Sequence, residues 1–322
     1  MLNIIGLVAL LAMTAVLVWS SVRSWRLKNS FLKWGGVGAT ALFAVAAFSV
    51  SVLVVSGLIK LHVRNAPAPN VKVAGTPEQI ERGRAISDSF CGACHSKTGT
   101  LTGGWDVGTE LPMYMGAFVS ANLTPAGRVS QWSDGDIFRA IRNGVDADGH
   151  WLMMMSYTSA SRLSDEDTQA LIAYIRSQPP AGGTIANPPD QLNLLGLAML
   201  GAGLLPPGKP IVMGVNTAPA KGPTAAYGEY ILSYQDCREC HGQQLTGGVP
   251  GQLGPIGPDL SIVKNWKREE FIQTLRTGID PGGHELSGRM PWRSIGKMDD
   301  DELTAIYNYL SHTLGNQNTA TY

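Results

Sequence analysis

The 322-residue sequence has few charged side chains and only four cysteines. Its 25 basic residues balance its 25 acidic ones, and charged residues make up 16% of the chain. A neutral balance excludes the simplest nucleic-acid-binding proteins, which need clustered Lys and Arg in excess. All four cysteines lie in two copies of one pattern, which excludes a disulfide-rich scaffold. A hydrophobic content of 44% excludes a disordered chain and allows a membrane segment.

Two long apolar runs open the chain. No ionisable side chain occurs from Met1 to Val22, and Trp34–Gly57 is again almost wholly apolar. Because a helix needs about 20 apolar residues to cross a bilayer, we predict a transmembrane hairpin over residues 1–64, with spans of about 2–22 and 34–59. The alternative is a cleaved secretory signal, which requires a basic region before its apolar run; Met1–Asn3 has none.

Charge predicts the orientation of this hairpin. Arg23, Arg26, Lys28 and Lys33 lie between the two runs, and nothing basic precedes the first. Lys and Arg in short loops stay in the cytoplasm, so the rest of the chain and both termini should face the periplasmic or other extracytoplasmic side of the cytoplasmic membrane. Residues 1–64 carry +6 and the remainder −6. An excess of acidic side chains in residues 65–322 favours a partner with a basic docking surface.

The rest of the chain divides into two domains and a linker. We expect the first domain over 76–180, where Thr-Pro-Glu at 76–78 resembles a helix cap, and the second over 224–322. The Pro/Gly-rich linker at 181–223 contains an apolar patch at 192–205, which is too short to span a bilayer. This patch predicts either an interfacial or partner-docking helix or a linker helix packed between the domains.

The two domains repeat one another, and each ends in a helix with an acidic first turn. The extra 12 residues of the first domain lie between Cys91 and Trp132. The repeat indicates duplication of a small helical unit, since a solenoid needs several stacked copies. At a constant offset of 134, the first-domain residues Trp132, Arg142, Gly144, Asp146 and His150 correspond to Trp266, Arg276, Gly278, Asp280 and His284.

The cysteine motifs, Cys-Gly-Ala-Cys-His at 91–95 and Cys-Arg-Glu-Cys-His at 237–241, are c-type haem attachment signals. Two thiols three positions apart add to the porphyrin vinyl groups, and the adjoining imidazole binds the iron. A zinc site would have to join two pairs more than a domain apart, and thiol–disulfide chemistry would leave both histidines unexplained. We therefore predict two covalently attached haem c groups, held by Cys91, Cys94, Cys237 and Cys240 with His95 and His241 as iron ligands.

An electron-carrying haem needs a sixth ligand, and methionine raises its potential. Met155 and Met290 stand at matching places before the terminal helix of each domain, so we predict that they are the axial ligands. Met153 and Met154 are adjacent competitors of Met155. Bis-histidine ligation, through the repeated histidines of the two domains, is the remaining alternative.

These motifs resemble class I c-type cytochromes, and most closely the haem domains of membrane-bound dehydrogenase cytochrome subunits. The likeness rests on both CxxCH motifs, Trp-Ser-Asp-Gly-Asp-Ile-Phe-Arg at 132–139, Met-Ser-Tyr at 155–157 and Gly-Pro-Asp-Leu at 257–260. It covers roughly 76–180 and 224–314. It implies a mainly α chain with two tandem cytochrome c-like helical domains after the hairpin.

The resemblance also concerns individual residues. It implies that a proline carbonyl, from Pro258 or Pro255, orients the axial histidine. The family has Pro-Tyr after the methionine, whereas this chain has Ser156. The repeated tryptophans either pack against haem or are ordinary core residues, and the repeated arginines either pair with haem propionates or lie on the surface.

The sequence thus indicates a membrane-anchored dihaem cytochrome c. It would relay electrons between a quinol-oxidising or dehydrogenase module and a soluble carrier or terminal acceptor in a respiratory or photosynthetic chain. Chemistry on an organic substrate would belong to a partner subunit of the membrane complex. One alternative is a dihaem enzyme with one open haem, for peroxide or sulfur-compound chemistry. Another is the dihaem subunit of a cbb3-type oxidase.

Replacing Cys237 and Cys240 together by Ala should leave one covalent haem per chain, because the thioether bonds of the second site cannot form. Denaturing electrophoresis with haem staining and pyridine haemochrome quantification measure this number. A count that stays at two would refute the attachment sites.

Overall fold

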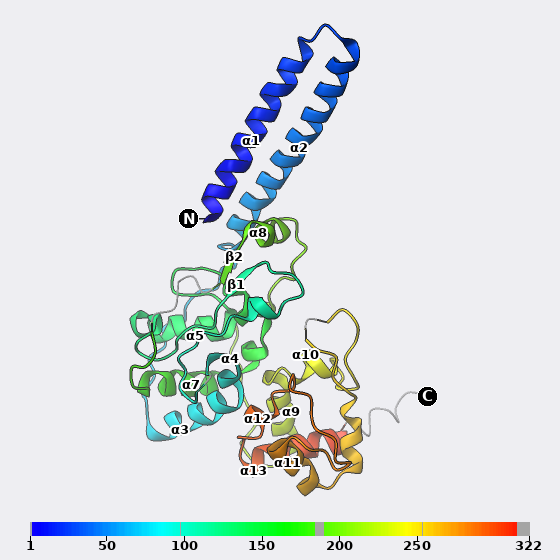
Figure 1. Ribbon diagram of the computed structural model, residues 1–322. Helices are drawn as coiled ribbons and strands as arrows, with labels where there is room; N and C mark the ends of the chain where they lie inside the picture. The colour runs from blue at the N-terminus through cyan, green and yellow to red at the C-terminus, as the bar shows by residue number, and fades with distance from the viewer. Residues whose placement is uncertain (1, 97, 184–189, 253, 314–322) are drawn as a thin grey trace.

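The computed structural model describes residues 2–96, 98–183, 190–252 and 254–313. A long two-helix hairpin stands on a head made of two small helical domains (Figure 1). In the residues described, the head contains short helices joined by long loops and one two-stranded sheet.

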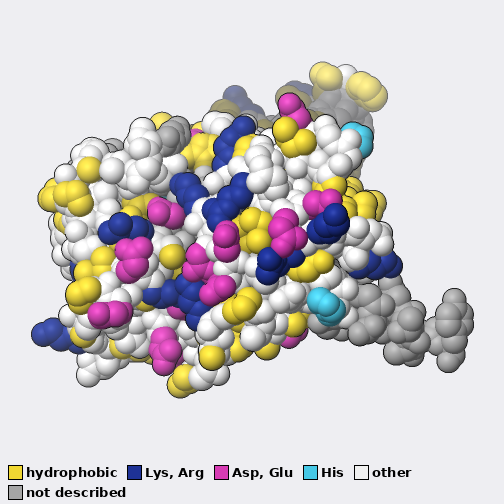
Figure 2. All heavy atoms as spheres, turned by 90° about the horizontal axis from the view of Figure 1, so that it is seen from below, with side chains coloured by type: hydrophobic (Ala, Val, Ile, Leu, Met, Phe, Trp, Pro, Cys, Tyr) yellow, Lys and Arg dark blue, Asp and Glu magenta, His cyan; other side chains and the backbone are white. Residues whose placement is uncertain are grey.

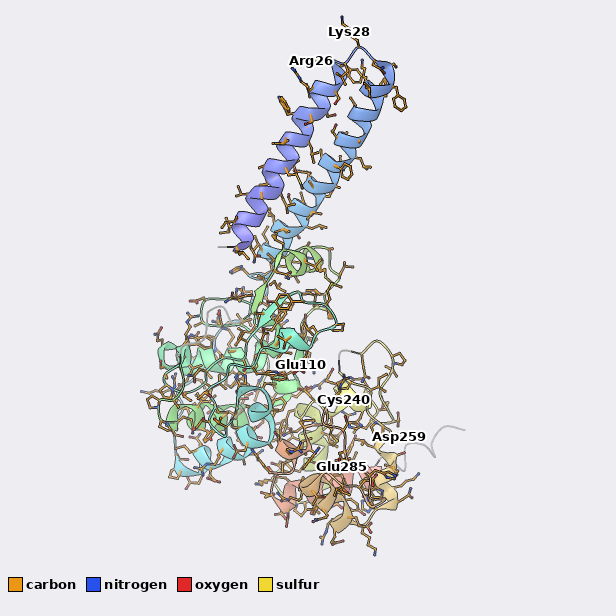
Figure 3. The ribbon with its side chains drawn as sticks, viewed as in Figure 1. Arg26, Lys28, Glu110, Cys240, Asp259 and Glu285 are labelled. Carbon is orange, nitrogen blue, oxygen red and sulfur yellow. The ribbon has the colours of Figure 1, made fainter. Side chains whose placement is uncertain are left out.

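The hairpin consists of α1 (Leu2–Trp25) and α2 (Ser30–Lys60). Both helices extend beyond the predicted spans, and both are long and apolar enough to cross a membrane. Arg26 and Lys28 lie at the tip farthest from the head (Figure 3), whereas the beginning of α1 lies at the head end (Figure 1). The basic tip and the head are therefore at opposite ends of the hairpin.

The first domain is built around a crossing of its first and last helices. As the sequence indicates, Thr76 caps α3 in a capping box with Gln79, and Ser164 caps α7 through the amide of Asp167. A Cβ on Gly83 would overlap the Ala170 carbonyl, so only glycine permits this close crossing. The elements are α3 (Pro77–Ile86), a π turn (Ser87–Cys91), α4 (Gly92–His95), 3₁₀ turns (Val107–Glu110, Arg128–Gln131, Ser159–Arg162), β1 (Gly116–Phe118), α5 (Asp134–Asn143), α6 (Met153–Tyr157) and α7 (Asp165–Ser177).

The second domain repeats this arrangement. Gly228 meets the Ala305 carbonyl at the corresponding crossing of α9 and α13. The repeated glycines, Gly144 and Gly278, both end a helix in the left-handed conformation, which favours glycine. The elements are α9 (Ala225–Tyr234), α10 (Cys237–His241), a 3₁₀ turn (Leu260–Asn265), α11 (Arg268–Thr277), α12 (Trp292–Ile295), α13 (Asp300–Asn308) and a π turn (Tyr309–Thr313).

The linker joins the first domain to the hairpin. Its β2 (Asp190–Leu192) pairs antiparallel with β1, and β1 lies within the insertion that distinguishes the first domain from the second. The following α8 (Leu194–Gly201) packs against α2, where Cβ atoms on Gly57 and Gly201 would overlap backbone carbonyls of the opposite helix. The expectation of a helix packed between the two cytochrome domains is wrong, because α8 packs between the hairpin and the first domain: Leu197 shares a buried cluster with Val54 of α2 and Phe118 of β1.

The two domains share one hydrophobic core. Ile86 and Leu171 of the first domain belong to the same buried cluster as Tyr230 and Leu303 of the second. Above this cluster, the guanidinium of Arg82 binds Asp167 of its own domain at 2.7 Å and Glu302 of the other domain at 2.6 Å. The Tyr230 hydroxyl also donates to Asp167 at 2.6 Å. The head is therefore a single packed unit.

We expect Arg82→Ala to destabilise the head by about 3–5 kcal/mol, because it leaves the largely buried Asp167 without its cation and Glu302 with only Lys221, at 3.8 Å. The free energy of unfolding, from urea titration of the detergent-solubilised holoprotein followed by haem absorption, measures this. Arg84→Ala is the matched control, since Arg84 on the same helix makes only an exposed pair with Glu81, and its loss should cost less than about 1 kcal/mol. Equal losses in the two variants would contradict the bridging role of Arg82.

Candidate haem sites

A cavity of about 660 Å³ lies in the first domain beside the cysteine motif. This volume falls within the range of about 300–1,000 Å³ that is typical of ligand sites. Cys91, Cys94 and His95 line it, as do Met154 and Met155 from α6. Much of the remaining wall is aliphatic, formed by Val129, Ile137, Ile141, Leu163, Leu171 and Ile175. The cavity thus brings two thiols, an imidazole and a thioether to one apolar space, as a covalently held porphyrin requires.

Both motif histidines are oriented by a backbone carbonyl. His95 Nδ1 donates to the Ala121 oxygen at 2.8 Å, and His241 Nδ1 donates to the Pro258 oxygen at 2.7 Å. Each contact leaves Nε2 as the nitrogen with a lone pair for iron. Burial lowers the pKa of His95, which favours the neutral imidazole that metal binding requires. The Pro258 carbonyl makes the contact with the axial histidine that the resemblance implies. The same role of Ala121 in the first domain was not predicted, because this position holds no proline and the insertion obscures its match to Pro258.

Three of the four cysteines, Cys91, Cys237 and Cys240, are half-buried, and Cys94 is exposed. Burial raises the pKa of Cys91 and that of Cys237 to about 12. Cysteine pairs that exchange disulfides have lowered pKa values, so this environment argues against a thiol–disulfide role. Within the described ranges, no three His, Cys, Asp or Glu side chains gather as a metal cluster. Both alternatives, the thiol–disulfide role and the zinc site, are therefore disfavoured.

The three consecutive methionines of α6 have different surroundings. Met153 is 2% exposed and belongs to the cluster that includes α8 residues. Met154 lines the cavity but also packs against that cluster. Met155 is half-buried, lines the cavity and has no place in the core clusters. Of the three, Met155 has the thioether most available to a porphyrin.

Ser156 follows Met155 at the position where the family that this chain resembles has proline. It is buried, and its hydroxyl accepts from Trp151 Nε1 at 2.7 Å and donates to the Met153 carbonyl at 2.8 Å. Its backbone oxygen accepts from Lys209 in the linker at 2.9 Å. Hydrogen bonds thus hold the loop after the methionine, in a manner that the sequence does not reveal.

The repeated histidines do not have the surroundings of axial ligands. His150 packs its ring edge-on against His62, is not part of the cavity wall, and donates its backbone amide to Asp146 at 2.8 Å. His284 has a side chain that is 82% exposed, and its amide donates to Asp280 at 2.9 Å. The repeated Asp–His pairs therefore stabilise a backbone turn, and this geometry disfavours bis-histidine ligation.

The repeated arginines are also structural. Arg142 is 3% exposed and donates to the Leu163 carbonyl at 3.0 Å and to Asp165 at 2.9 Å. Arg276 donates to the Met298 carbonyl at 2.7 Å and to Asp300 at 3.0 Å. Each arginine thus joins one helix to the beginning of the terminal helix of its domain. The surface assignment is wrong for Arg142, and pairing of either guanidinium with a propionate is disfavoured by these partners.

Arg128 is the better candidate for a propionate partner, and sequence analysis missed it. It lines the cavity, and its Nη2 donates to Asp148 at 2.9 Å. Its Nη1 is buried and has no hydrogen-bond partner among the described residues. A buried donor without a partner is costly, and a haem carboxylate would satisfy it. Trp132 also lines the cavity, as expected of a residue that packs against haem. The residues present therefore fit a porphyrin.

The second site lies beside the first. His241 is 7% exposed, and Cys237 and Met290 are half-buried against the core cluster shared by the two domains. Cys91 packs against the same cluster. Moreover, Cys240, Arg289 and Pro291 of the second domain line the first-domain cavity, and Cys240 lies on the side of its domain that faces the first (Figure 3). The cavity thus crosses the domain boundary and reaches the second attachment motif.

The chain belongs to the cytochrome c family described as cytochrome C oxidase, cbb3-type, subunit III, whose model matches residues 78–175 and 223–310, more than half of the chain. This match confirms the resemblance to cytochrome c in two segments of a mainly helical chain. Family membership implies covalently bound haem c and electron transfer.

Several curated relatives are components of dehydrogenases. The chain is 34% identical to a subunit of the nicotinate dehydrogenase of Pseudomonas putida over 73% of its own length and 21% of the relative's. It is 26% identical to the fructose dehydrogenase cytochrome subunit of Gluconobacter japonicus, over 82% of this chain and 58% of the relative. It is 27% identical to the gluconate 2-dehydrogenase cytochrome c subunit of Pantoea cypripedii, over 72% of this chain and 58% of the relative. It spans less than two thirds of each of these relatives.

Replacing Met155 by Ala should open the first haem and lower its potential, because the iron loses a thioether ligand. Carbon monoxide should then bind one of two reduced haems, with the haem content unchanged. Met154→Ala is the matched control and should leave the haem closed. Carbon monoxide binding in the Met154 variant alone would transfer the ligand role to Met154.

Proposed function

We propose that this protein is a membrane-anchored dihaem electron relay. Haem c held by Cys91 and Cys94 would be ligated by His95 and Met155, and the second, on Cys237 and Cys240, by His241 and Met290. The observation that carries the proposal is the continuity of the first cavity with Cys240, Arg289 and Pro291 across the domain boundary. Two porphyrins attached to such neighbouring segments would exchange electrons directly, within one rigid head.

Closed coordination favours electron transfer over substrate chemistry. With both axial positions of each iron filled by the chain, no position remains for a substrate. The haem, when bound, supplies one-electron chemistry, while His95 and His241 are held by carbonyls and the apolar cavity wall keeps water from the iron. Reaction at an organic substrate would belong to another component of the complex.

The basic tip of the hairpin supports the proposed orientation. Arg26 and Lys28 lie at the end opposite the head (Figure 3). With the tip in the cytoplasm, as positively charged loops prefer, both haem domains would face the periplasm or an equivalent compartment. That is the side on which c-type haem is attached.

The proposed partner is a dehydrogenase, with a quinol-oxidising module as the other electron donor considered. The relatives named above include cytochrome subunits of fructose and gluconate dehydrogenases, which supports the first choice. The electron acceptor would be a soluble carrier or a terminal oxidase. The face of the head seen in Figure 2 carries basic and acidic side chains interspersed, and not one acidic patch. A basic docking partner would have to use another face.

The test is electron delivery within the intact complex. The chain should be extracted from its membrane in mild detergent and supplied, in separate assays, with nicotinate, fructose and gluconate. We expect one substrate to reduce both haems, seen as a doubled haem absorbance change relative to the Cys237→Ala/Cys240→Ala variant. In the oxidised protein, two neighbouring low-spin irons should also broaden each other's paramagnetic resonance signals, and the same variant should abolish this effect.

Three results would contradict the proposal. Carbon monoxide binding to one haem of the unmodified, reduced protein would favour the enzyme alternative. Stable association with a copper-haem oxidase subunit, without a dehydrogenase, would favour the cbb3-type alternative, although the family match covers only the cytochrome c segments and not the hairpin. Reduction of only one haem by every donor would contradict the relay.

A further inference from the structure

Asp190 is a buried carboxylate at the first haem cavity. It is 6% exposed, lines the cavity and is the first residue of β2, where it pairs with Phe118 of β1. Burial raises its pKa to about 7, so the site makes the ionised form costly. A buried acid of this kind needs hydrogen-bond donors, and its partners indicate what it does.

The partners of Asp190 are the first amides of the helix that bears Met155. Its Oδ2 accepts from the backbone N–H of Met153, and the backbone N–H groups of Met153 and Met154 both lower the pKa of the carboxyl group against the effect of burial. The residue before this helix, Leu152, provides no side-chain cap. Asp190 therefore performs, from a distant segment, the task that an N-cap residue usually performs locally.

The same segment is fixed to the membrane anchor. Asn193, three residues after Asp190, caps α8 by accepting from the Gly196 amide at 2.9 Å, and α8 packs on α2. Asn3 at the beginning of α1 donates its side-chain amide to the Leu192 carbonyl at 2.6 Å. A short, continuous path thus leads from the hairpin through β2 to α6.

We propose that Asp190 is a positioning residue for the first haem: its carboxylate fixes the beginning of α6 so that Met155 is held towards the iron, and β2 ties this arrangement to the membrane hairpin. The proposal rests on the axial role of Met155 given under the proposed function. The second domain supplies an internal comparison, because Met290 lies in a loop outside this path.

The affinity of the oxidised first haem for added imidazole measures how firmly Met155 is held, since imidazole must displace it. In Asp190→Ala we expect at least about tenfold tighter imidazole binding at one haem, because a buried backbone N–H that loses its acceptor contributes a factor of this size. The visible absorption band of the sulfur–iron(III) bond should weaken for that haem only. Asp190→Asn keeps one acceptor oxygen and should give a smaller increase in affinity.

At a pH well above 7, where Asp190 is ionised, Asp190→Asn should also raise the potential of the first haem, because it removes a negative charge that favours iron(III). Loss of the thioether in the Ala variant acts in the opposite direction. The potential of the Asn variant reports the charge near the iron, whereas the imidazole affinity reports how firmly Met155 is held. Glu166→Gln is the control, since Glu166 is an exposed acid of the same domain, and it should change neither the imidazole affinity nor the potential.

The proposal is overturned if the imidazole affinity is unchanged in both the Ala and the Asn variants of Asp190. If the Ala variant does not assemble with haem, an unchanged affinity in the Asn variant alone overturns it. Equal changes at both haems would also overturn it. The Met155→Ala variant separates this failure from that of the proposed function. If Met155→Ala opens the first haem while the Asp190 variants do not, only the positioning role is lost; if Met155→Ala has no effect, the ligand assignment itself fails.

Discussion

The contact between the two domains is the constraint on which both haem sites depend. One apolar cluster joins Ile86 and Leu171 to Tyr230 and Leu303, and both cysteine motifs border it. Because the cluster is continuous, neither motif can move away from the other without exposing core side chains to water. Arg82 strengthens the constraint, since its guanidinium compensates one buried carboxylate from each domain. The separation of the two haems would therefore be a property of the folded head and not of a flexible linker.

A second connection holds the head on its anchor. The insertion in the first domain provides β1, the linker provides β2, and α8 closes against α2 at glycines. The second domain lacks the insertion, and the described linker contacts place the first domain next to the hairpin (Figure 1). The duplicated units have thus taken different positions relative to the membrane. In the proposed relay, one haem would lie near the bilayer and the other farther out, where a soluble partner can approach.

Outside the cysteine motifs and the methionines, most of the residues repeated between the two domains stabilise the fold and do not line the haem cavity. The repeated Arg, Gly, Asp and His positions of the two domains were visible from the sequence, and each occupies the same place in both folds. Arg142 and Arg276 bind the beginning of a helix, Gly144 and Gly278 end one, and the Asp–His pairs stabilise a turn. By contrast, Arg128 and Ala121, which sequence analysis missed, have no repeat signature.

The sequence by itself determined the hairpin, the two helical domains and the attachment motifs, because these depend on local patterns: apolar run length, capping residues, and two cysteines and a histidine at fixed spacing. Only the tertiary structure decided which of three adjacent methionines faces the cavity, that Arg142 is buried, that α8 packs on the hairpin, and that Asp190 lies at the beginning of α6. These features join segments far apart in the chain, such as Asp190 with Met153 and Arg82 with Glu302. Such contacts depend on how complete helices pack together, and no local spacing encodes them.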